Sequence, residues 1–119
     1  MTLDATALLA IQRRADGWER LVARVIEAGN ARVPATALAE AGMVLAAEGS
    51  MLDVLDLHEI VGTLTLTVVP FTEADWSAAV HEYHRRRRSG ERDAARFGEC
   101  LTAAVAARTG ADVVSVQDE

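Results

Sequence analysis

The chain has 119 residues, 50% of them hydrophobic and 25% charged, which is the balance of one folded domain rather than of a disordered segment. Its formal net charge of −6 argues against a protein that coats nucleic acid, because phosphate binding is normally led by positive charge. A single cysteine gives no disulfide framework, and we see neither a leader sequence nor a membrane-spanning apolar run, so we expect a cytoplasmic protein with no membrane partner.

The first half of the chain predicts two short strands, each followed by a pair of helices. The expected order is strand, helix, helix, strand, helix, helix, over residues 1–4, 6–14, 16–28, 32–34, 36–48 and 51–61. Gly29 ends the second helix, and Gly49 breaks the third from the fourth. In the fourth helix, Leu52, Leu55 and Ile60 are expected to face the core.

The second half continues the same alternation. Residues 64–69 are rich in β-branched side chains and predict a strand that ends at Pro70. A capping-box pattern at residues 72–75 opens a helix that ends in four arginines, and a polar loop follows over 89–95. A helix over 97–109 and a strand over 113–116 complete the chain. Strands separated by helices predict parallel pairing, and hence a three-layer α/β/α domain with a short parallel central sheet.

Four acidic residues lie on four separate predicted elements: Asp4, Glu40, Glu99 and Asp118. In an alternating β/α chain, strand ends and the helices that follow them meet at one edge of the sheet. Carboxylates gathered there form a pocket of hard oxygen ligands, which suits Mg²⁺ or Mn²⁺ and chemistry on a phosphate. Acidic residues are common in this chain, at 18 of 119 positions, so their distribution over distant segments supports the site more than their number does.

These residues also resemble the signatures of PIN-domain ribonucleases. In that family an aspartate ends the first strand with Ser or Thr two residues later, as Asp4 and Thr6 do here. A helical glutamate is the second signature, matched by Glu40, and the segment Phe97-Gly98-Glu99-Cys100-Leu101 is similar to the third. The resemblance covers nearly the whole chain. Its closest form is the VapC-type toxin of bacterial toxin–antitoxin pairs.

The resemblance implies one PIN-like domain over residues 1–119 that acts as a metal-dependent endoribonuclease. Asp4, Glu40 and Glu99 would hold Mg²⁺ or Mn²⁺, and Asp118 would hold the ion or its waters. The implied substrate is structured RNA such as tRNA. The implied partners are a second copy of the chain and a small antitoxin whose basic tail blocks the site.

The chain departs from the family pattern in two places. The third acid is usually aspartate, but here it is Glu99, whose side chain is one methylene longer. The family also carries a glycine, acid and aromatic stretch after the last strand, whereas this sequence closes with Gln117-Asp118-Glu119. Two alternatives therefore stay open: a degenerate PIN domain that binds RNA or an antitoxin without cleaving, and a phosphatase-like hydrolase on a similar acidic scaffold.

Other polar residues have two interpretations each. Thr6 fits both an N-cap and a hydrogen-bond donor to a ligand carboxylate. The arginines near the acids would favour a helix C-terminus electrostatically or guide RNA phosphates. These arginines are Arg85, Arg86, Arg87, Arg88, Arg92 and Arg96. The His81–His84 pair is expected on a solvated face. Trp76 and Cys100 are expected in packing or in an interface rather than in chemistry.

Overall fold

Four short parallel strands form the centre of the domain in this computed structural model, which describes residues 1–90 and 96–116. The strands are β1 (Thr2–Leu3), β2 (Arg32–Pro34), β3 (Thr67–Val69) and β4 (Val113–Val114). They lie in the order β3-β2-β1-β4, so the first and last strands of the chain are neighbours. Leu3 pairs with Val114, and Val33 pairs with Val68. The parallel pairing confirms the predicted α/β class.

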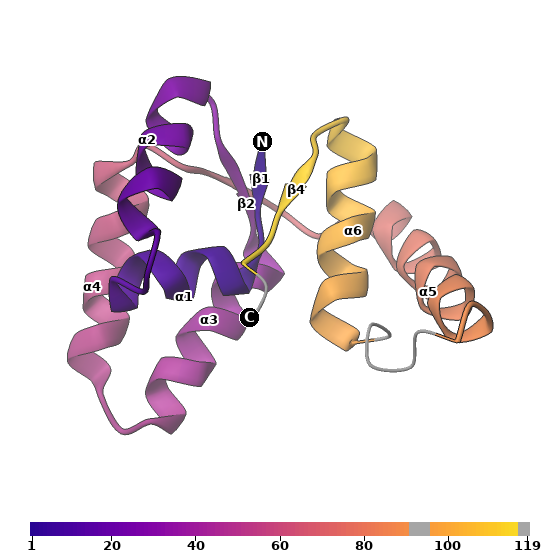
Figure 1. The fold of residues 1–119 in the computed structure, drawn as a ribbon. Coiled ribbons are helices and arrows are strands. Elements are labelled where there is room, and N and C mark those ends of the chain that lie inside the picture. Colours follow the sequence, from indigo (N-terminus) through magenta and orange to yellow (C-terminus); the bar gives the residue numbers. More distant parts are fainter. Residues whose placement is uncertain (91–95, 117–119) are drawn as a thin grey trace.

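Six helices in the described residues cover both faces of this sheet (Figure 1). They are α1 (Ala5–Arg13), α2 (Trp18–Ala28), α3 (Ala35–Ala47), α4 (Met51–Thr63), α5 (Glu73–Arg88) and α6 (Phe97–Thr109). Helices α1 to α4 gather on one side of the strands. Helix α6 lies on the other side, and α5 packs outside it (Figure 1). The three-layer α/β/α arrangement is therefore as predicted.

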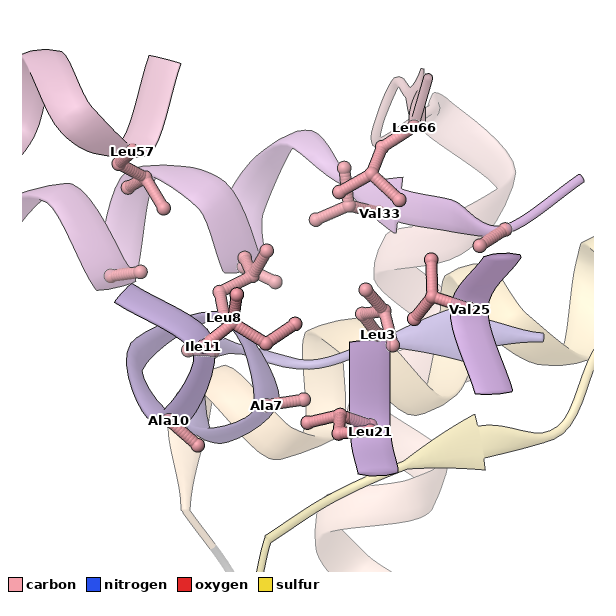
Figure 2. Close-up of a cluster of buried hydrophobic side chains, with 14 of the residues drawn as sticks. Leu3, Ala7, Leu8, Ala10, Ile11, Leu21, Val25, Val33, Leu57 and Leu66 are labelled. Atoms are coloured by element: carbon pink, nitrogen blue, oxygen red, sulfur yellow. The ribbon is translucent and has the colours of Figure 1, made fainter. Parts of the chain in front are cut away.

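The main core lies between the sheet and helices α1 to α4. Leu3 and Val33 from the strands meet Leu8 from α1 and Leu45 from α3, and each is at most 1% exposed. Figure 2 shows these contacts around Leu3 and Leu8, with Val25 of α2 closing one end. Burying a side chain of this size stabilises the fold by about 1.5–3 kcal/mol. The strands are short, and this packing rather than the sheet hydrogen bonds fixes their positions.

An ion pair with a buried carboxylate attaches α6 to the start of α5. Arg108 donates from Nε to Asp75 Oδ1 at 2.9 Å and from Nη2 to Oδ2 at 3.1 Å, and Asp75 is only 1% exposed. Asp75 also accepts a hydrogen bond from the Thr72 backbone N–H at 2.8 Å, which is the return half of the predicted capping box. The Arg108 hydrogen bonds lower the pKa of the Asp75 carboxyl below its usual value.

Two details differ from the sequence-based expectation. Leu52 and Leu55 do not face the core: they are 77% and 59% exposed, and Leu57 is the buried leucine of α4 instead. The third strand begins at Thr67 rather than at residue 64, because α4 extends to Thr63 and Thr65 then adopts a left-handed backbone. None of the described helices combines the length and the apolar character that a membrane crossing needs.

Candidate active site

Asp4 is the most firmly held acid of the predicted site. It directly follows β1 and is the N-cap residue of α1, where its Oδ1 accepts a hydrogen bond from the Ala7 backbone N–H at 3.0 Å. The Thr6 hydroxyl donates to the same oxygen at 2.6 Å, and the Ser115 hydroxyl donates to Oδ2. Asp4 is 6% exposed, so these donors fix its carboxylate in one orientation.

Thr6 and Ser115 tie Asp4 to the end of the last strand. The Val116 backbone N–H donates to Thr6 Oγ1 at 2.8 Å, while Thr6 itself donates to Asp4. The N-cap of α1 is thus Asp4 and not Thr6, and Thr6 is instead a hydrogen-bond donor to the Asp4 carboxylate. Ser115 was not predicted. Its signal was its position just after a strand that runs parallel to β1, because such strands end at the same edge of the sheet.

Glu40 reaches the same place from the first half of α3. Its carboxylate lies against the first turn of α6, so close to Gly98 that a Cβ on Gly98 would overlap it. Only a residue without a side chain permits this approach. The first turn of a helix carries partial positive charge, which favours the carboxylates of Glu40 and Glu99 at this position.

Asp4, Glu40 and Glu99 line one pocket of about 50 Å³, together with Ala5, Thr6, Arg96, Gly98 and Thr102. Burial raises the pKa of the Glu40 carboxyl, and the negative charges of Asp4 and Glu99 raise it further, while Arg96 opposes them. The three predicted acids from β1, α3 and α6 therefore share one electrostatic environment. A cation in the pocket would relieve their mutual repulsion.

Glu99 differs from Asp4 and Glu40 because it forms an ion pair with an arginine of the neighbouring helix. Its Oε2 accepts a hydrogen bond from Arg86 Nη1 of α5 at 2.9 Å. Within residues 1–90 and 96–116, no three His, Cys, Asp or Glu side chains are placed closely enough to hold a metal ion. The pocket thus brings Asp4 and Glu40 together, and Glu99 lines it while it is paired with the neighbouring helix.

The donor set of the pocket nevertheless suits Mg²⁺ or Mn²⁺ by its chemistry. Asp4, Glu40 and Glu99 offer carboxylate oxygens, the hydroxyls of Thr6 and Ser115 hold one of those carboxylates in place, and neither His nor Cys lines the pocket. A space of about 50 Å³ exceeds what one water needs, so an ion and part of its hydration shell can enter. The residues fit such an ion except in the orientation of Glu99.

The predicted arginines that the structure describes have different partners. Arg85 donates to Glu82 at 2.5 Å, and Arg86 bonds to both Glu82 and Glu99. Arg87 stacks over the Tyr83 ring at 5.8 Å, and Arg88 is exposed. Arg96 is exposed and lines the acidic pocket. Of these side chains, Arg86 and Arg96 are the two that the structure places at the acidic pocket among the described residues.

The other residues singled out in the sequence are not placed in the acidic pocket by the structure. Asp118 and Arg92 lie outside the described residues. His81 and His84 are exposed on α5, as expected of a solvated face. Cys100 is buried, and burial raises the pKa of its thiol, which disfavours the nucleophilic thiolate.

Comparison with known proteins agrees with this geometry. The sequence matches the PIN domain family over residues 1–119. The chain belongs to the PIN-domain family. Among solved structures the PIN fold recurs in Mycobacterium tuberculosis VapC20, a sarcin-ricin loop cleaving toxin, with a TM-score of 0.70 at 15% identity over 98% of this chain and 88% of that one. No curated protein matches the sequence. The family resemblance seen in the sequence is confirmed.

Proposed function

We propose that this PIN-domain protein is a metal-dependent endoribonuclease and the toxin of a toxin–antitoxin pair. The observation that carries the proposal is the shared pocket of Asp4, Glu40 and Glu99 at the carboxyl edge of a parallel sheet. Membership of the PIN family and the fold shared with VapC20 support it. Structured RNA such as tRNA or a ribosomal RNA loop is the substrate class we favour, and an RNA substrate would place the protein in the cytoplasm.

In this proposal Asp4 and Glu40 hold Mg²⁺ or Mn²⁺, Glu99 completes the set, and Asp118 contributes to the ion or its waters. The bound ion supplies charge stabilisation at a phosphate and a more acidic water. Thr6 and Ser115 keep the Asp4 carboxylate oriented toward the pocket. The arginines of α5 and Arg96, which lines the pocket, attract and align the RNA backbone.

Two exposed apolar surfaces support the two protein partners of the proposal. The α5–α6 surface consists of Phe71, Trp76, Val80, Tyr83, Phe97 and Leu101, which line a groove of about 640 Å³. Trp76 is 60% exposed and Phe97 is 79% exposed, which is unusual for large apolar side chains outside an interface. We assign this surface to a homodimer. The α3–α4 surface, made of Met43, Met51, Leu52 and Leu55, remains for an apolar segment of the antitoxin.

The test is a cleavage assay with purified protein on tRNA and on a ribosomal RNA fragment. Activity is expected with Mn²⁺ or Mg²⁺, is expected to disappear with EDTA, and should fall by orders of magnitude in Asp4→Asn, because the ion supplies both polarisation and nucleophile. RNA that binds but stays intact under all metal conditions would instead support the degenerate, non-cleaving PIN domain. The bond of Glu99 to Arg86, and the lack of three metal-ligating side chains close enough to hold an ion among the described residues, favour that second candidate.

A further inference from the structure

The Arg86 guanidinium connects helices α5 and α6 through two carboxylates. Its Nε donates to Glu82 Oε1 at 2.8 Å, and its Nη1 donates to Glu99 Oε2 at 2.9 Å. The Arg86 side chain is only 18% exposed, so the bridge is largely screened from water. An ion pair in such a position is stronger than one on an open surface.

Glu82 fixes the position of this guanidinium from within α5. Glu82 precedes Arg86 by four residues, which places both side chains on one face of the helix. Hydrogen bonds from Arg85 and Arg86 lower the pKa of Glu82 to about 2, so that carboxylate stays charged at physiological pH. Arg86 is therefore held in place by its own helix while its Nη1 donates to Glu99 of α6.

Glu99 accepts this hydrogen bond, which makes its carboxylate less available to the acidic pocket. Glu99 lines the pocket with Asp4 and Glu40, yet its Oε2 is engaged by Arg86. In the described part of the chain no three acids converge closely enough to hold an ion. While Oε2 is bonded to Arg86, that oxygen is less available to an ion in the pocket.

We propose that Arg86 is a positioning residue that competes with the divalent cation for Glu99 and thereby sets the affinity of the metal centre. The proposal rests on the metal-dependent function proposed above. In the metal-free protein, Arg86 neutralises Glu99 and holds it on the α5 side of the pocket. When the cation binds, it takes over Glu99 from Arg86.

This competition predicts the opposite result from a supporting role. An arginine that merely oriented Glu99 for the ion would strengthen metal binding, and its loss would weaken binding by about 10–100-fold. If Arg86 competes, its loss must tighten binding. The sign of one measurement therefore decides between the two roles.

The experiment is a calorimetric titration of Mn²⁺ into wild type, Arg86→Met and Arg85→Met at physiological ionic strength. Met retains an unbranched apolar stem but loses the charge. Arg85→Met is the matched control, since Arg85 carries the same charge one residue away and also donates a hydrogen bond to Glu82, while the 2.9 Å hydrogen bond to Glu99 comes from Arg86. At physiological ionic strength, salt screens exposed charges over about 8 Å, so a charge farther away has little effect on Mn²⁺ binding. We expect Arg86→Met to lower the Mn²⁺ Kd by about five- to tenfold and Arg85→Met by less than about twofold.

A second set of variants, made in the Glu99→Gln protein, distinguishes competition for Glu99 from a general effect of the Arg86 charge on Mn²⁺ binding. In Glu99→Gln, the further change Arg86→Met should leave the Mn²⁺ Kd unchanged within about twofold, because there is no carboxylate left to compete for. Arg86→Lys, which keeps the charge but not the planar fork, should give an intermediate Kd and covers the case in which Arg86→Met folds poorly.

An unchanged or weaker Mn²⁺ affinity in Arg86→Met, in a wild type that binds Mn²⁺, would overturn the competition and leave the metal centre standing. The same tightening in the Glu99→Gln background would also overturn it. If no variant binds Mn²⁺, both the metal-dependent function and the role of Arg86 are refuted. Binding that appears only in Arg86→Met would support the competition in its strongest form.

Discussion

The carboxylate of Glu40 lies directly against Gly98, in the space that any side chain at residue 98 would fill. This contact joins α3 to the first turn of α6 at the acidic pocket. The backbone of Gly98 is not left-handed, so the need for glycine here comes from the neighbouring carboxylate and not from the chain conformation. A glycine inside a helix normally destabilises it by about 1 kcal/mol relative to alanine. Gly98 therefore allows the Glu40 carboxylate to lie here, although glycine is less favourable than alanine for the stability of α6.

Gly98→Ala is therefore expected to separate activity from stability. The new methyl group displaces the flexible end of Glu40, so metal affinity and RNA cleavage should each fall at least about tenfold. The melting temperature should stay equal or rise slightly, because alanine favours the helix. Gly62→Ala is the control, since a Cβ at that helical glycine meets nothing within 4 Å. A fully active Gly98→Ala enzyme would show that Glu40 does not need this position.

Asp4→Asn tests the metal centre through stability. Added Mn²⁺ should raise the melting temperature of wild type by several degrees when it is about a hundredfold above its Kd. Asparagine still caps α1 about as well as aspartate, so the variant should fold, but most of the Mn²⁺ shift should disappear. Asp16→Asn makes the same charge change at an exposed position and should keep the shift. Equal shifts in both variants would count against Asp4 as a ligand.

Glu99→Asp tests the unusual length of the third acid. The shorter side chain draws the carboxylate away from Arg86 and weakens the 2.9 Å bond, and it restores the length that is usual in the family. We expect RNA cleavage with Mn²⁺ to be equal to wild type or higher. Glu99→Gln keeps the length without the charge and should lower cleavage at least about tenfold. A loss of activity in Glu99→Asp as large as in Glu99→Gln would contradict this prediction.

The Arg108–Asp75 pair should be a stability element with a defined pH dependence. Arg108→Met leaves a buried carboxylate with weaker partners and should destabilise the protein by about 1–3 kcal/mol at pH 7 in urea unfolding. Arg20→Met, at an exposed position of α2, should change stability by less than about 0.5 kcal/mol.

The direction of the pH effect follows from the pKa of Asp75, which is lowered in the folded protein. Such a group stabilises the fold above its unfolded pKa of 3.8, and that contribution is lost as the pH falls through the lower folded value. The difference between wild type and Arg108→Met should accordingly be constant near neutral pH and shrink below about pH 4. A difference that grows on acidification would exclude this ion pair as its source.

The α5–α6 surface should control the oligomeric state. Trp76→Glu places a charge in the centre of the proposed dimer interface, and the variant should elute and scatter light as a monomer where wild type is a dimer. Leu52→Glu introduces the same charge on the α3–α4 surface and should remain dimeric. If Leu52→Glu dissociates the dimer and Trp76→Glu does not, the two surfaces have the opposite roles.

Most of the fold was predictable because its signals are local. The helices follow the apolar periodicity and the glycines that end them, and Gly29 and Gly110 do adopt the left-handed backbone of helix ends. The predictions fail where tertiary contacts determine which face of a helix is buried. Leu52 and Leu55 have helical spacing typical of a core, yet α4 turns Leu57 inward and leaves them on a surface.

The site was predictable only in part, for the same reason. The positions of Asp4 and Glu40 follow from strand ends and from the family signature, whereas the bond between Arg86 and Glu99 joins residues on two packed helices. Sequence spacing cannot show which of four consecutive arginines turns toward α6. Ser115 was equally hidden, because its role depends on the pairing of β4 with β1.

That pairing also sets when the acidic pocket can first be completed during synthesis of the chain. Asp4 and Ser115, whose hydroxyl orients it, are 111 residues apart, and β1 lacks one neighbour until β4 has been made. At about 5–20 residues per second, several seconds pass between the synthesis of the two. If the protein is the nuclease we propose, a growing chain has no assembled centre with which to attack the ribosome that is producing it. The order of the strands would thus delay any such activity until β4 has been made.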